Sequence, residues 1–193
     1  MTTTSSPNRV ALFQAKIFVE TYHISIGHHI VFTDFDVFWQ HDAVAAIQHY
    51  PVFDSFDMLL SPHHHKYDKQ INSGLFYAKA NLKTYTFFRN AWWRANKHLA
   101  IMTQFGDQAV LNGLLHVDGP VNTIAPVAQT LGLMWSALPA NRFGDWEGGS
   151  WGSNVDMKQF TTLHFTNINA SSKAACLMEF YYDYEIKSSI LAV

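Results

Sequence analysis

Two aspartates separated by one residue, Asp34 and Asp36, directly follow the apolar run Ile30 to Thr33. If the backbone stays extended, side chains two residues apart leave a strand on the same face, so both carboxylates would point the same way. Neighbouring carboxylates with apolar flanks repel each other and lose hydration unless a cation lies between them. A divalent ion such as Mn²⁺ or Mg²⁺ meets that demand and can also bind a diphosphate. An ordinary turn that closes the strand is the alternative interpretation.

Two later segments carry polar residues that could line a ligand beside this pair. Asn72 supplies an amide at the start of a predicted strand, and Gly74 permits close approach of the backbone to a ligand. Asp107 and Gln108 open a predicted helix. Each segment also has a purely structural interpretation, because Asn-Ser-Gly is common in bulges and Asp107 could serve only as an N-cap.

Near the end of the chain, His164 lies at the end of an apolar run, and Lys173 follows nine residues later. An imidazole together with carboxylates suits Mn²⁺ better than Ca²⁺, so His164 is a candidate third ligand. Lys173 could neutralise a phosphate, although an isolated lysine is usually only a surface residue. The run of three histidines from His63 to His65 has no acidic or cysteine partner at ligand spacing, and it indicates a solvated loop.

The elements that must position these residues alternate between helical and β patterns, which predicts an α/β domain with a mixed sheet flanked by helices. Residues 1–9 are expected to be a frayed start and residues 10–193 one domain. The apolar spacing predicts helices over residues 11–26 (closed by Gly27), 42–50 (capped by Asp42), 82–99, 107–115 and 171–182. Strands are expected over residues 30–33, 56–60, 71–78, 121–127, 133–138 and 161–165.

Two remaining segments are expected to be loops. Residues 61–69 are polar, and residues 141–154 are rich in glycine and tryptophan. The second loop could be a lid over bound ligands or an irregular segment anchored by its tryptophans.

Composition limits the class of partner. Hydrophobic residues make up 48% of the chain and charged residues 15%, which is typical of a packed globular protein. A formal net charge of -2 provides no long-range field for nucleic acid or anionic lipid, so no nucleic-acid partner is expected. No apolar run approaches the roughly 20 residues that a membrane-spanning helix needs. We therefore expect no membrane segment in this chain.

The block from Val31 to Trp39, with Lys16 and Gly27 before it, resembles the first motif of the nucleotide-diphospho-sugar transferase domain of glycosyltransferase family 77. This family includes plant and algal xylosyl-, arabinosyl- and galactosyltransferases. Three further motifs of the family have counterparts in the same order, at residues 72–77, at residues 107–112, and at His164 with Lys173. Each block is weak alone, but the four in sequence are specific and span about residues 16–182.

The resemblance implies a GT-A-like fold with a partial Rossmann-like nucleotide-binding half. It also implies a retaining transfer of a sugar from a UDP-sugar donor to a carbohydrate or glycoprotein acceptor. Mn²⁺ (or Mg²⁺) would be bound by Asp36 and His164, with Asp34 facing the ribose or the water shell of the metal.

The remaining implied roles concern the donor. Asn72 and Gly74 would line the donor sugar together with Asp107 and Gln108, and Lys173 would contact the diphosphate. Asp107 and Gln108 are the candidate catalytic residues, although the sequence marks no obvious nucleophile.

Members of this family carry roughly one further βαβ portion before the helix with Lys16, so the resemblance predicts a chain truncated at its N-terminus. Relatives usually work in the Golgi lumen, which is the expected location. Two alternative functions stay open. One is a non-catalytic remnant that binds a glycan or a partner protein. The other is a metal-dependent phosphohydrolase using Asp34, Asp36 and His164, which the scarcity of further carboxylates beside them disfavours.

Overall fold

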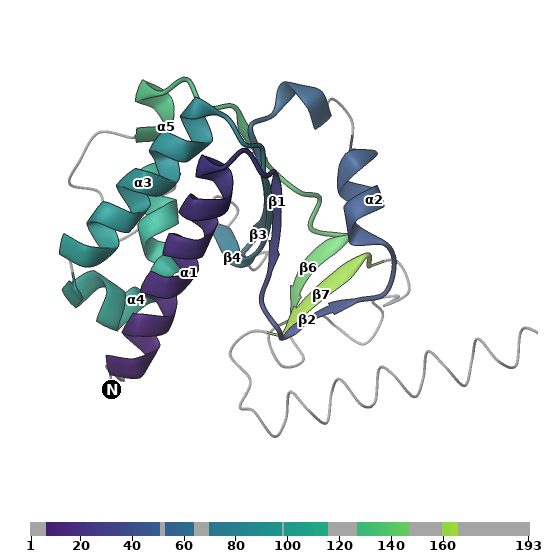
Figure 1. Ribbon diagram of the computed structural model, residues 1–193. Helices are drawn as coiled ribbons and strands as arrows, with labels where there is room; N and C mark the ends of the chain where they lie inside the picture. The colour runs from purple at the N-terminus through teal and green to yellow at the C-terminus, as the bar shows by residue number, and fades with distance from the viewer. Residues whose placement is uncertain are drawn as a thin grey trace, which may run out of the picture.

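The computed structural model describes residues 7–50, 53–63, 70–97, 99–115, 127–146 and 160–165. These residues form the predicted mixed α/β arrangement, in which two small sheets lie side by side with helices around them (Figure 1). The first sheet has the spatial order β1 (Ile30–Thr33), β4 (Ile71–Ala78), β3 (Met58–Pro62) and β5 (Trp135–Ala137). β4 is antiparallel to both of its neighbours, whereas β5 is parallel to β3.

The second sheet was not expected. It has the order β2 (Val37–Trp39), β7 (Thr162–Phe165) and β6 (Phe143–Trp146), with β2 antiparallel and β6 parallel to β7. β6 lies in the segment that the sequence predicts to be a loop, so that expectation is wrong for residues 143–146. The reason is that β6 is a strand through pairing with β7, a partner that the local glycine-rich composition does not reveal.

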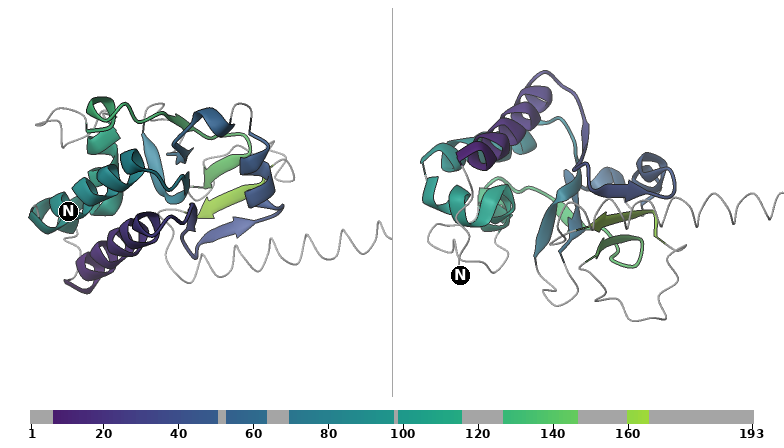
Figure 2. Two further views of the ribbon diagram at one scale, coloured as in Figure 1. Left: turned by 45° about the horizontal axis from the view of Figure 1, so that its top comes forward. Right: turned by 90° about the horizontal axis from the view of Figure 1, so that it is seen from below.

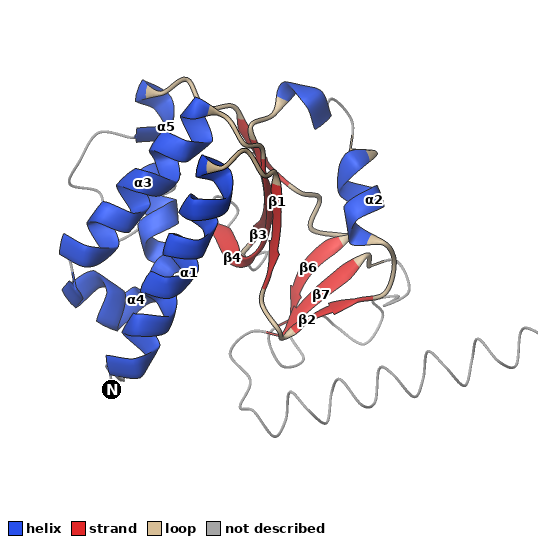
Figure 3. Cartoon of the chain, in the orientation of Figure 1, coloured by secondary structure: helices blue, strands red, loops and turns tan. Residues whose placement is uncertain are grey.

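Helices cover one face of the first sheet, as Figures 2 and 3 show. They are α1 (Pro7–Ser25), α3 (Leu82–Lys97), α4 (Leu99–Leu115) and α5 (Val127–Thr130). On the opposite side lie α2 (Ala43–Gln48) and the second sheet, and a short 3-10 helix spans Phe53–Ser55. Among the described residues, no helix has the length and apolarity needed to cross a membrane.

β4 is the centre of this packing, since it is buried along its whole length. Successive side chains of a strand point to opposite faces. Phe76 and Ala78 accordingly pack into the core under the helices, whereas Leu75 and Tyr77 pack into a second core with Ile47 of α2. Because both faces are covered, the polar residues at the start of β4 lie inside the protein, next to the end of β1.

α1 places Val10, Ile17 and Ile24 in the core, whereas other large apolar residues on its outer side, such as Phe18 and Tyr22, are about half exposed. It begins at Pro7, earlier than the expected Ala11, and proline is favoured at the first helical position. The predicted end at Gly27 is confirmed. Gly27 has φ 87°, and the His28 N–H donates to the His23 carbonyl at 3.0 Å, which closes the helix in a Schellman motif.

α2 and α3 confirm two further expectations. The Asp42 carboxylate accepts a hydrogen bond from the Ala45 N–H at 2.9 Å and caps α2, which ends at Gln48, slightly before the expected residue 50. α3 matches the expected helix to within two residues at its end. Expected strands at residues 71–78, 133–138 and 161–165 correspond to β4, β5 and β7, and the one at 56–60 is displaced two residues to β3.

Other expectations need correction. α4 begins at Leu99 and not at Asp107, but Gly106 interrupts it with φ 72° and ψ −167°, so Asp107 still opens a separate helical segment. Val127, the last residue of an expected strand, begins α5, since a short apolar run does not by itself distinguish a strand from a helix. The rest of that expected strand, the predicted helix at 171–182 and Lys173 lie outside the described residues.

Candidate functional site

Asp34 and Asp36 lie where the chain passes from the first sheet to the second. β1 ends at Thr33 and β2 begins at Val37, and the Val37 N–H donates to the Asp34 carbonyl at 3.2 Å. The backbone between the aspartates is therefore a turn, so the expected extended geometry is wrong. A turn is needed because the strand direction must change between the two sheets. The Asp34 N–H donates to the Gly74 carbonyl at 2.7 Å, which fixes this turn to β4.

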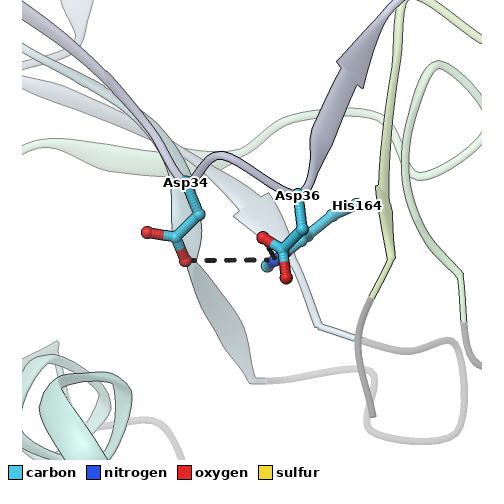
Figure 4. A group of neighbouring side chains, drawn as sticks. All are labelled: Asp34, Asp36 and His164. Carbon is cyan, nitrogen blue, oxygen red and sulfur yellow. Dashed lines mark hydrogen bonds and ion pairs between the residues drawn. The ribbon is translucent and has the colours of Figure 1, made fainter. Parts of the chain in front are cut away.

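The second sheet brings His164 to the two aspartates. In the β2–β7 register Val37 pairs with His164, so the imidazole lies beside the turn. Its Nε2 is 3.1 Å from Asp36 Oδ1 and 3.9 Å from Asp34 Oδ2 (Figure 4). One candidate ligand atom from each of the three residues lies within 4.8 Å of the others. We call Asp34, Asp36 and His164 the ion group.

Solvent access within the ion group is uneven. The His164 side chain is 8% exposed, whereas those of Asp36 and Asp34 are 22% and 34% exposed. Burial raises the pKa of Asp34, an effect that its neighbours Lys16 and His164 oppose. A buried imidazole with two partly open carboxylates leaves the carboxylate side of the group accessible to an ion from solution.

Gly74 explains how the imidazole fits against β4. A Cβ atom at this position would lie 2.2 Å from Cε1 and 2.6 Å from Nδ1 of His164, closer than any side chain tolerates. Glycine at residue 74 therefore makes room for the ring that completes the ion group. Two carboxylates and one imidazole nitrogen suit a divalent ion such as Mn²⁺, so the residues present fit the metal that the sequence predicts.

Lys16 on α1 joins this group to the rest of the site. Its Nζ lies 3.3 Å from Asp34 Oδ1 and 2.8 Å from Asp107 Oδ2, and it donates to the Ser73 carbonyl at 2.9 Å. The Lys16 side chain is only 9% exposed. Burial alone would lower the pKa of Lys16, but the carboxylates of Asp107 and Asp34 outweigh burial and raise it. Lys16 is thus a fixed cation between α1, β4, α4 and the aspartate turn.

Glu20 follows Lys16 by one helical turn and faces the same interior. It is 2% exposed, and neither carboxylate oxygen has a hydrogen-bond partner among the described residues. Burial raises the pKa of Glu20 well above its usual value; the charge of Lys16 opposes this shift, and those of Asp107 and Asp34 add to it. We call Lys16, Asp107 and Glu20 the lysine group.

Sequence reasoning gave Lys16 only a place in a motif and gave Glu20 no role. A signal was nevertheless present. Both charges occur at spacing i, i+4 on α1, interleaved with the core positions Ile17 and Ile24. Charged residues among the core positions of a helix indicate buried partners elsewhere in the fold.

The remaining predicted donor residues meet at the start of β4. The Asn72 side-chain oxygen accepts a hydrogen bond from the Gly74 N–H at 2.6 Å, and Gln108 Oε1 accepts one from the Ser73 N–H at 3.4 Å. Asn112 holds the same strand to α4, accepting from the Ile71 N–H and donating to the Ile71 carbonyl, both at 2.9 Å. Residues far apart in the sequence thus form one continuous polar region beside Asp34.

Not every predicted residue is placed alike within this region. Asp107 is 4% exposed and its carboxylate is directed at Lys16, whereas Gln108 is half-buried. Lys173 lies outside the described residues. His63 follows β3 and its N–H donates to the Gln70 carbonyl at 2.8 Å, while His64 and His65 lie outside the described residues.

Comparison with known protein families finds a match over most of the chain. The family model described as nucleotide-diphospho-sugar transferase matches residues 11–177, which include every residue of the ion group and the lysine group. No curated protein and no solved structure matches the chain. Since the matched region spans most of the sequence, the chain belongs to the nucleotide-diphospho-sugar transferase family.

Proposed function

We propose that this chain transfers a sugar from a nucleotide-diphosphate donor to an acceptor hydroxyl, using a divalent ion held by Asp34, Asp36 and His164. The observation that carries the proposal is the convergence of these three residues at the junction of the two sheets. Family membership makes glycosyl transfer the reaction to expect. The finer features, namely a UDP-sugar, Mn²⁺, retention of configuration, membership of glycosyltransferase family 77 and a Golgi location, are part of the proposal.

The reaction breaks the bond between the anomeric carbon and the diphosphate oxygen and forms a bond from that carbon to the acceptor oxygen. The proton of the acceptor hydroxyl passes to the departing diphosphate. In a retaining transfer, attack and departure occur on the same face of the sugar. A bound Mn²⁺ supplies a Lewis acid that stabilises negative charge on the diphosphate.

The residues of the chain orient the reactants. Asp36 and the buried His164 form the close pair of the ion group, at 3.1 Å. Asp34 lies between that pair and Lys16, at the point where the polar region at the start of β4 begins. We therefore place the diphosphate at the ion group and the donor sugar toward Gln108 and the Asn72–Gly74 segment.

The test is binding of UDP-sugars to the purified chain, measured by calorimetry with and without Mn²⁺. We expect binding that requires the ion and that Asp36→Ala abolishes. Asp54→Ala is the matched control, because the Asp54 side chain is fully exposed and lies outside the ion group. Donor binding that survives both chelator and Asp36→Ala would contradict the proposed role of the ion.

Two other outcomes would favour the alternative functions. Binding of a glycan that neither chelator nor Asp36→Ala affects would indicate a non-catalytic remnant. Release of inorganic phosphate without any acceptor sugar would indicate a phosphohydrolase. Transfer of sugar to an acceptor, followed by mass spectrometry of the product, separates the proposed reaction from both.

A further inference from the structure

Lys16 makes two hydrogen bonds, to Asp34 and the Ser73 carbonyl, and a close ion pair with Asp107 inside the protein. An ammonium group has three N–H donors, and the Lys16 Nζ has three oxygen neighbours, in Asp34, Asp107 and the Ser73 carbonyl. The ring of Phe32 lies 4.1 Å from the Nζ and covers it from β1. The ammonium is therefore held in one place by contacts to several elements.

The two carboxylate oxygens of Asp34 face different neighbours. Oδ1 lies 3.3 Å from Lys16 Nζ, whereas Oδ2 faces His164 Nε2 at 3.9 Å within the ion group. The contact at Oδ1 restricts rotation of the carboxylate and so directs Oδ2 toward the place proposed for the ion. At the same time, the fixed positive charge near Asp34 repels an incoming divalent ion.

Lys16 also reaches the region proposed for the donor sugar. The Lys16 Nζ donates to the Ser73 carbonyl, and the Ser73 N–H donates to Gln108 Oε1. Its shortest contact is to Asp107, which directly precedes Gln108. One side chain thus connects the ion group to the polar region at the start of β4.

We propose that Lys16 is a positioning residue that links the two parts of the site, orienting Asp34 for the ion and holding the Asp107–Gln108 segment for the donor. This inference rests on the proposed function. Its consequence is that Lys16 weakens ion binding by repulsion while it supports transfer by orientation. A residue needed only for folding would not produce these opposite effects.

The experiment compares Lys16→Met with Lys16→Arg, which keeps the charge. Mn²⁺ affinity is measured without nucleotide, by electron paramagnetic resonance of the free ion, and sugar transfer is measured at saturating Mn²⁺. For Lys16→Met we expect Mn²⁺ to bind at least threefold more tightly and kcat to fall at least tenfold. For Lys16→Arg we expect Mn²⁺ affinity within twofold of the wild type.

Unchanged or weaker Mn²⁺ binding by a folded Lys16→Met would overturn the inference, as would an unchanged kcat. If Lys16→Met does not fold, Lys16→Met with Asp107→Asn is measured against Asp107→Asn alone, because this pair avoids a buried carboxylate without a counter-ion. The double variant must then bind Mn²⁺ more tightly than Asp107→Asn alone. A wild-type chain that binds Mn²⁺ but no UDP-sugar would refute the proposed function, and the Mn²⁺ comparison would still test Lys16.

Discussion

The ion group and the lysine group are neighbours that share Asp34, yet they compensate clustered carboxylates in different ways. In the ion group the Asp34 and Asp36 side chains are 34% and 22% exposed. In the lysine group the Asp107 and Lys16 side chains are 6% and 9% exposed, and Glu20 is 2% exposed. The first group lies at the surface between two sheets, and the second lies beneath α1.

The difference in solvent access fits the two kinds of cation, a permanent lysine in one group and the proposed metal ion in the other. A carboxylate buried away from water must have a permanent counter-charge or be neutral, because desolvation of a charge is too unfavourable otherwise. The lysine group uses both solutions, with Lys16 beside Asp107 and a raised pKa for Glu20. Where water reaches the carboxylates, an ion can enter and leave, as the proposed metal-assisted binding of the donor requires.

The largest expected effect is on folding, from removal of the permanent cation. We expect Lys16→Ala to lower the free energy of unfolding by about 3–5 kcal/mol, because it leaves Asp107 as a buried charge without its partner. Urea denaturation followed by circular dichroism measures this loss. Lys83→Ala is the control, because Lys83 is half exposed and pairs with Asp57 at 3.3 Å. Equal losses in both variants would mean that burial does not distinguish the lysine group.

The exchangeable cation should stabilise the folded chain only while it is present. At 100 times its dissociation constant, Mn²⁺ should raise the free energy of unfolding by about 2.7 kcal/mol, because it binds the folded state only. Thermal unfolding with Mn²⁺ and then with chelator measures this effect. His164→Asn should remove most of it. A Lys16→Arg variant should keep it, which would separate the ion group from the lysine group.

Gly74→Ala sharpens the comparison by disturbing the ion group and the neighbouring Asn72 but no residue of the lysine group. The added methyl would collide with His164, so we expect a loss of about 1–3 kcal/mol in stability and a weaker Mn²⁺ affinity. Ser73→Ala is the matched control, because the described hydrogen bonds of Ser73 come from its backbone. Tighter Mn²⁺ binding by Gly74→Ala would show that His164 does not contribute to the ion site.

Glu20→Gln has the smallest expected effect and tests the neutral carboxyl. Because the pKa of Glu20 is raised in the folded state, the folded chain keeps a proton that the unfolded chain releases above the usual pKa of 4.5. Stability of the wild type should therefore fall as pH rises above this value. The glutamine variant should lack that part of the decline and be about 1 kcal/mol more stable at neutral pH. Parallel pH profiles of the two proteins would show that Glu20 is not held neutral.

Much of the local structure was determined by the sequence itself. Short-range signals gave α1 with its end at Gly27, the cap of α2 at Asp42, and the strand that runs into Asp34. These features depend on backbone preferences and on hydrogen bonds between residues a few positions apart, which a sequence displays directly. The order of the polar motifs was also sufficient to predict the family.

The tertiary structure alone decided how those motifs meet. β2 and β6 are strands because of their pairing with β7, and the same pairing places His164 beside Asp36. The need for glycine at residue 74 depends on an imidazole far away in the chain. Lys16 acquires its partners only when α1 packs beside β4 and α4. Strand register and helix packing arise from contacts between distant segments, and a local pattern of residue types contains no record of which segments will meet.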